Sequence, residues 1–479
     1  MGINTINTMK PIPLCVDLDG TLIKTDLLIE SVLDLIKRKP WYLLYLPLWI
    51  YRGKAYLKAA VASRVDFTEA DFPLNNEVVD YVREQRQIRQ TLLVSGSHQS
   101  LVDAVAASTD LFDKTCGSDE QTNLTGQNKR DWLVAEFGVG GFDYIGNDQD
   151  DNLVWPSARE ALLVSKPNGI VEKTSIDFNR VFITDKPRLS DYLKLMRVHQ
   201  WVKNFLILVP LFLGQLVGDP EAVAAIIPAF LAMSLLASAT YIFNDMLDLQ
   251  SDRENANKSK RALASGQISI LAGCKLICLL MIGVLLLALM LPAGFNLMLV
   301  LYLLATLAYS FVLKRKEIVD VLMIAGLHTM RVIAGTVAID VDWSFWLLAF
   351  SMFMFFSLAL AKRVAELKNM VASGRMQTTG RGYHVDDIPV LLAMGVSSGL
   401  ASILIIAMYI NGDKVQQLYS HPYYLWLVCP IFMYWITRIW MKTSRGEMNE
   451  DPVLFAIRDR VSHVVALSVI LIILAATVL

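Results

Sequence analysis

Three carboxylates follow directly on an apolar run in the stretch Asn244-Asp245-Met246-Leu247-Asp248-Leu249-Gln250-Ser251-Asp252-Arg253. In a helix, Asp245, Asp248 and Asp252 are spaced i, i+3 and i+7, so their side chains share one face. They would repel one another unless a cation lay between them. Oxygen-only ligands favour Mg²⁺ that keeps some of its waters and is completed by substrate phosphates. We therefore expect this stretch to bind Mg²⁺ and a diphosphate.

Composition divides the 479-residue chain into two parts of different kind. Before about residue 190 it is mixed and charged, and afterwards it consists of apolar runs separated by short charged loops. We expect an amino-terminal domain over residues 1–166, a linker over 167–187 and a membrane domain over 188–479. The net charge of −1 averages unlike parts and gives no indication of a nucleic-acid partner. The start of the sequence lacks a basic region followed by an apolar core, so we expect no cleavable signal.

Nine apolar segments are long enough to be predicted as membrane spans: residues 202–217, 222–243, 271–291, 296–313, 318–339, 344–361, 388–410, 422–440 and 461–479. Lysines and arginines gather in alternate loops, including Lys314-Arg315-Lys316. By the positive-inside rule, the amino-terminal domain and the acidic stretch face the cytoplasm and the C-terminus lies outside. The sequence therefore predicts an all-α, multi-pass domain, which we expect in a bacterial inner membrane.

The acidic stretch also carries a family motif. The pattern N-D-x-x-D-x-x-x-D-R, followed by K-x-x-R-x-x-A-S-G at residues 258–266, resembles the first signature of the UbiA superfamily of intramembrane prenyltransferases. Three further segments, 197–204, 309–315 and 362–367, are similar to decaprenyl-phosphate phosphoribosyltransferase and its bacterial relatives. The resemblance implies transfer of 5-phosphoribose from phosphoribosyl pyrophosphate to a polyprenyl phosphate.

The resemblance also implies roles for individual residues. Asp245 and Asp248 would be catalytic, and Mg²⁺ would be bound by Asn244, Asp245, Asp248 and Asp252. Substrate-binding side chains would be Lys203, Asn204, Arg253, Tyr309, Lys314, Arg331, Lys362 and Arg363. Arg331 lies inside a predicted span, where Asp320 or a substrate phosphate is its expected partner, although it could equally brace the helices.

Two alternatives remain for the membrane domain. The first is an aromatic prenyltransferase that uses a polyprenyl diphosphate and carries a regulatory or inactive amino-terminal domain. Such family members usually have a second D-x-x-x-D after the sixth span, where this chain has Lys362-Arg363-x-x-Glu366. The second alternative is a transporter, because charge within a membrane also marks substrate paths. Against it, the acids gather at one mouth and no pair of broken helices is predicted.

The amino-terminal domain opens with a second motif. The apolar strand from Ile12 to Val16 leads into Asp17-Leu18-Asp19-Gly20-Thr21, which resembles the haloacid dehalogenase-like phosphohydrolases. The resemblance implies a Rossmann-like α/β fold with a helical cap, here at about residues 24–88. Asp17 would attack phosphorus and Asp19 would act as the proton donor and acceptor. Ser95 and Gly96 would hold a phosphoryl oxygen, and Lys129 would neutralise it.

The predicted metal loop departs from that family. After the strand Phe142 to Ile145 the family usually has Gly-Asp and a further Asp, whereas this chain reads Gly146-Asn147-Asp148-Gln149-Asp150-Asp151. Asn147 takes the place of the first metal-binding aspartate. Either Asp148 supplies the charge, giving a Mg²⁺ site of Asp17, Asp19, Asp148 and Asp151, or the site is weakened and the domain is an inactive phosphatase.

An aromatic segment interrupts the predicted cap. Residues from Trp41 to Tyr51 are almost wholly apolar, but eleven residues are too few to span a bilayer. The flanking bases suit a segment in the membrane interface, which would direct the domain toward a lipid-borne phosphate. A buried core of the cap is the other interpretation. Together the motifs predict a bifunctional membrane enzyme whose amino-terminal domain removes the 5-phosphate of the lipid-linked product.

Overall fold

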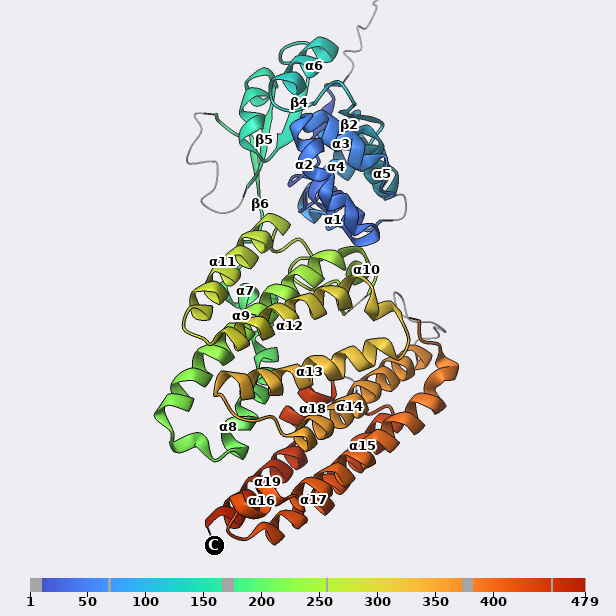
Figure 1. Ribbon diagram of the computed structural model, residues 1–479. Helices are drawn as coiled ribbons and strands as arrows, with labels where there is room; N and C mark the ends of the chain where they lie inside the picture. Colours follow the sequence, from blue (N-terminus) through green and yellow to red (C-terminus); the bar gives the residue numbers. More distant parts are fainter. Residues whose placement is uncertain are drawn as a thin grey trace, which may run out of the picture. The chain divides into compact units, whose positions relative to one another are not determined.

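The computed structural model describes residues 11–67, 70–165, 176–255, 257–372, 382–448 and 451–478. The chain forms two compact units, with element labels as in Figure 1. The first unit comprises residues 1–196 together with 242–277, and the second comprises 197–241 together with 278–479. The acidic stretch therefore belongs to the same unit as the amino-terminal domain.

A six-stranded parallel sheet organises the first unit. Its strands are β1 (Leu14–Val16), β2 (Thr91–His98), β3 (Lys114–Ser118), β4 (Asp143–Gly146), β5 (Ala161–Ser165) and β6 (Arg180–Ile183). Their order in the sheet is β3-β2-β1-β4-β5-β6, and every neighbouring pair is parallel. The predicted parallel α/β fold is confirmed. The strand order reverses between β1 and β4, where sheets of this kind bind ligands at the carboxyl ends of their strands.

Helices fill the connections of this sheet. They are α1 (Leu27–Arg38), η1 (Pro40–Leu44), α2 (Leu46–Tyr51), α3 (Lys54–Ala62), α4 (Asn76–Arg86), α5 (Gln99–Thr109), α6 (Gln127–Phe137), η2 (Gln149–Leu153), η3 (Trp155–Ser157), α7 (Leu189–Leu195) and α10 (Leu249–Arg253). The described residues between β1 and β2 are helical where they are regular, as the predicted cap requires. Strand β6 lies inside the predicted linker, of which residues 167–175 are outside the described part.

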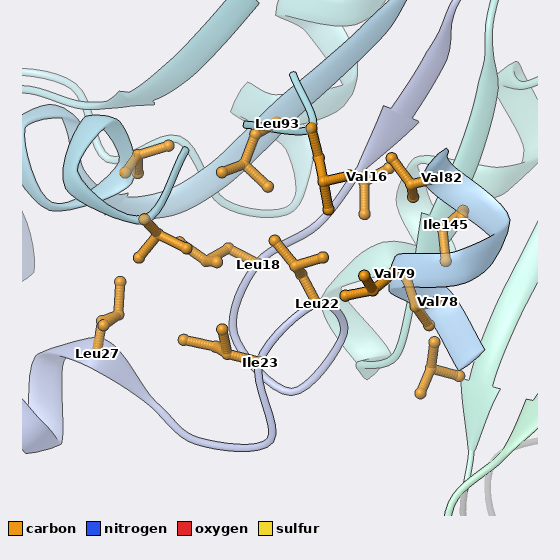
Figure 2. Close-up of a cluster of buried hydrophobic side chains, with 14 of the residues drawn as sticks. Val16, Leu18, Leu22, Ile23, Leu27, Val78, Val79, Val82, Leu93 and Ile145 are labelled. Carbon is orange, nitrogen blue, oxygen red and sulfur yellow. The ribbon is translucent and has the colours of Figure 1, made fainter. Parts of the chain in front are cut away.

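The sheet is buried on both faces because successive side chains of a strand point to opposite sides. On one face, Val16, Leu93 and Ile145 pack against α4 and α5, and Figure 2 shows Val78, Val79 and Val82 of α4 in contact with this layer. On the other face, Cys15 and Leu92 pack with Leu133 of α6, and all three are buried. Each fully buried apolar side chain contributes roughly 1.5 to 3 kcal/mol, so this double core fixes the strand ends that carry the polar motifs.

The second unit is helical. Its elements are η5 (Val198–Leu208), α8 (Val209–Leu213), η6 (Leu216–Gly218), α9 (Pro220–Leu247), α11 (Ile270–Ala288), α12 (Ala293–Phe311), η7 (Leu313–Arg315), α13 (Val319–Ala338), α14 (Phe345–Ala372), η8 (Val385–Asp387), α15 (Ile388–Ile410), α16 (Asp413–Leu418), η9 (Pro422–Leu427), α17 (Val428–Ser444), α18 (Pro452–Arg458) and α19 (Arg460–Val478). The last six residues of α9 and the first eight of α11 belong to the first unit.

Within the described residues, eight helices are long and apolar enough to cross a membrane, which supports a multi-pass membrane protein. The first of the nine predicted spans, residues 202–217, is instead the short apolar run Val198–Leu213, made of η5 and α8. A 3₁₀ helix rises about 2.0 Å per residue, so this run has a length of about 30 Å, near the thickness of the hydrocarbon core. The ninth span stays a prediction.

One glycine allows η5 to pack against α13. A Cβ on Gly335 would lie 2.1 Å from the carbonyl oxygen of Ile207, so a side chain there would force the two backbones apart. This close approach brings Asn204 of η5 within hydrogen-bond distance of Arg331 on α13.

Candidate functional site

A buried charge network surrounds Asp17 at the carboxyl end of β1. The Lys129 ammonium donates to Asp17 Oδ1 at 2.7 Å and to the Tyr144 hydroxyl at 2.9 Å. Tyr144 in turn donates to Asp151 Oδ1 at 2.7 Å. The Thr21 hydroxyl lies 3.3 Å from the other Asp17 oxygen. Three predicted site residues, Asp17, Lys129 and Asp151, are thus brought together, and Tyr144 is an unpredicted member.

Burial sets the protonation of this network. It raises the pKa of Asp17 to about 7, helped by the charge of Asp151 and opposed by Lys129. Burial lowers the pKa of Lys129, but Asp17 and Asp151 raise it by more, so the ammonium stays charged. The pKa of Asp17 is consequently close to neutral pH. A further cation beside it would favour the ionised form, which a nucleophile requires.

Asp19 is held by hydrogen bonds from three sides. Its Oδ1 accepts the Leu27 backbone N–H at 2.8 Å, and its Oδ2 accepts the hydroxyls of Ser97 at 2.7 Å and Ser95 at 3.3 Å. Burial and the charge of Asp26 raise the pKa of Asp19 to about 6, against these hydrogen bonds. A carboxyl group that titrates near neutrality suits general acid and base catalysis. Ser95 contacts Asp19 in this arrangement, which links two predicted site residues.

A lysine from the cap reaches the same sheet edge. Lys58 of α3 donates to the Gly96 carbonyl at 2.5 Å and to Asn123 Oδ1 at 2.7 Å. Partial burial lowers the pKa of Lys58, and the negative charges of Asp19 and Asp26 oppose this lowering. Gly96 also packs tightly, because a Cβ there would lie 2.4 Å from a methyl carbon of Thr125. Sequence analysis missed Lys58, because a lysine on a short amphipathic helix gives no motif.

In the loop after β4, Asn147 lies near Asp17, the predicted nucleophile, because both side chains contact Thr21. Asn147 Oδ1 accepts the Thr21 hydroxyl at 3.0 Å, and its amide lies so close to Gly20, which has a φ of +77°, that a Cβ there would clash. Asp148 is exposed, and its carboxylate caps η2 by accepting the Gln149 N–H at 2.6 Å. Asp151 Oδ2 accepts the backbone N–H groups of Asn147 and Asp148. Asn147 therefore lies beside Thr21, while Asp148 caps η2, and the role of Asp148 as a metal ligand stays a prediction.

The acidic stretch folds differently from the single helical face that its spacing predicts. Helix α9 ends at Leu247, and Asp248 has a ψ of 12°, so α10 begins in a new direction. Asp245 and Asp252 still converge, because Arg261 Nη1 lies 3.2 Å from Asp245 Oδ1 and 2.6 Å from Asp252 Oδ2. Burial raises the pKa of Asp252, and Arg261 opposes that rise.

Two predicted residues of this stretch contact the cap instead. Asp248 Oδ1 lies 3.4 Å from the Lys37 ammonium at the end of α1. Arg253 forms a buried, two-pronged ion pair with Glu30 of α1, with N–O distances of 2.5 and 2.9 Å. Its remaining hydrogen bonds go to the carbonyls of Asp71 and Ala264. In this arrangement Arg253 contacts protein groups, and its predicted substrate role stays a prediction.

The acidic stretch has oxygen ligands of the kind that Mg²⁺ binds. Asn244 Oδ1 is buried without a hydrogen-bond partner, and it precedes the convergent Asp245. A buried amide oxygen without a hydrogen-bond partner, in a stretch that carries carboxylates, fits a hard cation completed by diphosphate oxygens. Across the described residues, no group of three or more acidic, histidine or cysteine side chains is close enough to hold a metal. In this arrangement Arg261 neutralises the acids.

The second unit gathers cations around one acid. Lys203 of η5 and Lys362 of α14 each donate to the same oxygen of Asp451 at 2.9 Å. Burial raises the pKa of Asp451, but the two ammonium groups lower it by more, so this carboxylate stays ionised. Asp451 also caps α18 through the Val453 N–H. The predicted pair Lys203 and Lys362 is brought together by a residue that the sequence offers only as an Asp-Pro helix start.

Arg331 lies beside this cluster without a counter-charge. Its guanidinium donates to Asn204 Oδ1 at 2.7 Å, to the Tyr302 hydroxyl at 2.7 Å and to the Leu327 carbonyl at 2.6 Å. Within the described part of the chain, no carboxylate is within ion-pair distance of it. Asp320, its predicted partner, pairs with Arg363 instead. Lys203, Lys362 and Arg331 against Asp451 leave an excess of two positive charges on these four side chains.

The positive charge of Arg363 is compensated by two carboxylates. Arg363 is 1% exposed and donates to Asp320 at 2.6 Å and to Glu366 at 2.6 Å, while Tyr383 also hydrogen-bonds Asp320. The ion pair between Arg363 on α14 and Asp320 on α13 holds these two helices together. Tyr309 and Lys314, predicted to bind substrate, are half-buried at the end of α12 and in η7. Their roles stay predictions.

These observations describe a multi-pass helical membrane protein with carboxylates at one helix end and a cationic cluster, joined to a parallel α/β domain. The chain belongs to the UbiA prenyltransferase family, whose sequence model matches residues 207–478. Uncharacterized protein y4nM of Sinorhizobium fredii is 37% identical over 463 residues, or 95% of this chain and 89% of that protein. A match of that length includes residues of the amino-terminal domain.

Two further matches are a curated enzyme and a solved structure. Decaprenyl-phosphate phosphoribosyltransferase of Mycobacterium tuberculosis is 34% identical over 183 residues, which cover 37% of this chain and 61% of that enzyme. A UbiA homolog from Archaeoglobus fulgidus bound to GPP and Mg²⁺ matches with a TM-score of 0.46 and 14% identity, over 59% of this chain and 99% of that one.

Proposed function

We propose that this chain is a bifunctional enzyme. Its membrane domain transfers 5-phosphoribose from phosphoribosyl pyrophosphate to a polyprenyl phosphate, and its amino-terminal domain, a haloacid dehalogenase-like phosphatase, removes the 5-phosphate of that product. Similarity to decaprenyl-phosphate phosphoribosyltransferase supports the first activity. The proposal places the amino-terminal domain in the cytoplasm of a bacterium.

The observation that carries the proposal is the uncompensated charge of Arg331. A buried cation without an anionic partner costs several kcal/mol, and Arg331 is 3% exposed with no carboxylate among its described partners. Both proposed substrates carry phosphate, which would supply the missing charge. An aromatic acceptor would bring less anionic charge to the cluster of Lys203, Lys362 and Arg331.

The transfer step forms one bond and breaks one. An oxygen of the lipid phosphate attacks C1 of the ribose, and the bond from C1 to the pyrophosphate oxygen breaks. Mg²⁺, held by Asn244, Asp245 and Asp252, would neutralise the departing pyrophosphate. Arg331, Lys203 and Lys362 orient the phosphates and stabilise the charge that shifts between them.

In the amino-terminal domain, Asp17 attacks the phosphorus of the 5-phosphate. Asp19, hydrogen-bonded by Ser97 and Leu27, donates a proton to the departing 5-oxygen and then takes one from the water that releases phosphate. Lys129, 2.7 Å from Asp17, neutralises the nucleophile and the phosphoryl group. Mg²⁺, held by Asp17, Asp19 and Asn147, would add positive charge at the phosphoryl oxygens.

One incubation tests both activities. Purified full-length protein in detergent or liposomes receives Mg²⁺, polyprenyl phosphate and phosphoribosyl pyrophosphate labelled in the ribose. We expect label in the lipid phase as a ribosyl lipid, with free phosphate released in equal amount. Label that stays in water while 4-hydroxybenzoate becomes prenylated from a polyprenyl diphosphate would replace the first activity with the alternative. A lipid that retains its 5-phosphate would refute the second activity alone.

A further inference from the structure

The aromatic segment Pro40–Tyr51, formed by η1 and α2, presents an unusually apolar surface. Leu44 is 80% exposed and Tyr51 is 89% exposed. The other large side chains that are exposed in this segment are Trp41, Leu43, Tyr45, Leu48 and Ile50. Contiguous exposed apolar patches in soluble domains mark surfaces that bind a partner or a membrane.

The remaining side chains of the segment hold it to the cap. Trp49 is 5% exposed and packs with Leu35 and Val61, while Tyr42 and Leu46 contact the same cluster. The guanidinium of Arg64 lies 5.1 Å from the centre of the Trp49 ring. The segment is therefore amphipathic: one side packs into the cap, and the outward side is left without a covering element in the described part.

Contacts within the first unit place the start of this segment near the end of an apolar helix. Lys37 contacts Asp248, the residue directly after α9, and α9 is long and apolar enough to cross a membrane. Pro40 follows Lys37 by three residues, which can span at most about 10 Å. The buried pair of Glu30 and Arg253 fixes α1 against α10, which begins directly after Asp248. The aromatic segment consequently starts near the carboxyl end of the apolar helix α9.

Charge around the segment suits an anionic surface. Lys39, Arg52 and Lys54 flank it and are exposed, whereas the nearby acids Glu30 and Asp34 are paired with Arg253 and Arg38. Tryptophan and tyrosine with adjacent bases are typical of segments that lie at the headgroup level.

We propose that the outward side of Pro40–Tyr51 inserts into the headgroup region of the membrane that holds the helical domain, with anionic phospholipids as its partner. The proposal concerns the position of the cap and does not rest on either proposed activity. It assigns the outward residues to lipid and Trp49 to the cap.

Spin labelling of the full chain in liposomes of phosphatidylglycerol and phosphatidylethanolamine tests it. Cys116, Cys274, Cys278 and Cys429 are replaced by alanine, buried Cys15 is kept, and a nitroxide is attached at Leu44→Cys. We expect collisions with oxygen to exceed those with an aqueous nickel chelate by several-fold. Val139→Cys, at another exposed position of the amino-terminal domain, is the matched control and should show the opposite preference.

A label at Leu44 as open to nickel as the one at Val139 would overturn the proposal. So would a label shielded from both reagents, because that result indicates a protein partner. A second measurement needs no cysteine: the fluorescence of the wild type minus that of Trp41→Phe isolates Trp41. Quenching of this difference by brominated lipid supports insertion, and its absence contradicts it. In neutral phosphatidylcholine both signals should weaken, and an unchanged signal would contradict the role of anionic lipid.

Discussion

The network around Asp17 and the cluster around Arg331 bury charge in different ways. In the first, Lys129 lies within 3.5 Å of both Asp17 and Asp151, so one cation faces two carboxylates and the excess charge is negative. In the second, Lys203 and Lys362 share one carboxylate, Asp451, and Arg331 has no carboxylate among its described partners. An excess of negative charge favours a cation beside Asp17, whereas an excess of positive charge at Lys203, Lys362 and Arg331 favours an anion. The comparison predicts that substitutions affect catalysis in the first region and substrate binding in the second.

The largest effect is expected at Asp17. Asp17→Asn keeps the size and much of the hydrogen bonding but removes the nucleophile, so 5-phosphate release should fall by about 10⁴-fold or more. Phosphorylated lipid should then accumulate at the normal rate, as measured by mass spectrometry of the lipid phase. Slower formation of that lipid would show that the two regions do not act separately.

Arg331 should give the next largest effect, on transfer. Arg331→Met removes the uncompensated cation, and transfer should fall by about 10² to 10³-fold. Arg331→Lys keeps the charge and should recover part of the loss. The matched variant Arg363→Met breaks a compensated pair, so its main effect should be on thermal stability. A stability loss at Arg331→Met with normal transfer would make Arg331 a structural brace.

The acidic stretch supplies a third test. Asp245→Asn should lower transfer by about 10²-fold and raise the Mg²⁺ concentration needed for half-maximal rate. Asp248→Asn should cost less, because Asp248 is partly exposed and contacts Lys37 rather than Arg261. Equal losses at both positions would mean that Arg261 does not mark the metal-binding side of the stretch.

Lys58 should have a smaller effect. Its ammonium lies among Gly96, Asn123 and the charge of Asp19, so it can bind an outer phosphate or sugar oxygen of the substrate. Lys58→Met should raise the KM for the phosphorylated lipid about tenfold, the equivalent of one charged hydrogen bond, with kcat nearly unchanged. A fall in kcat alone would place Lys58 in support of Asp19.

The smallest effect concerns the outward aromatic side. Replacing Trp41, Leu44, Leu48 and Ile50 by serine should slow dephosphorylation of the lipid a few-fold and leave a soluble phosphomonoester unaffected. Trp49 is kept, because it is buried in the cap. Parallel losses on both substrates, together with a lower melting temperature, would show that the outward side stabilises the cap.

Much of this architecture could be predicted from the sequence. The family resemblance of the run Asp17 to Thr21 predicts the α/β fold and the residues at the sheet edge, and apolar length predicts most of the membrane helices. These features are local, since each depends on a few neighbouring residues. The network of Asp17 with Lys129 was reached through family resemblance rather than spacing.

Contacts between distant segments could not be predicted. Asp451 joins Lys203 and Lys362 across 248 and 89 residues, and nothing near Asp451 distinguishes it from an ordinary helix cap. The sequence left open whether Asp148 binds metal. The contacts that bear on this, Asp148 with Gln149 and Asn147 with Thr21, are not visible in the motif, and metal binding by Asp148 stays a prediction. The break at Asp248 was also missed, because the spacing of acids is compatible with a continuous helix.

The pair of Glu30 and Arg253 has a consequence for how the protein is made. The two residues are 223 positions apart, so at about 5 to 20 residues per second the ribosome needs on the order of ten seconds or more to supply the arginine. Until then, the nascent cap carries a carboxylate whose partner has not been synthesised. That partner arrives just behind α9, so completion of the amino-terminal domain waits for the first long apolar helix to emerge.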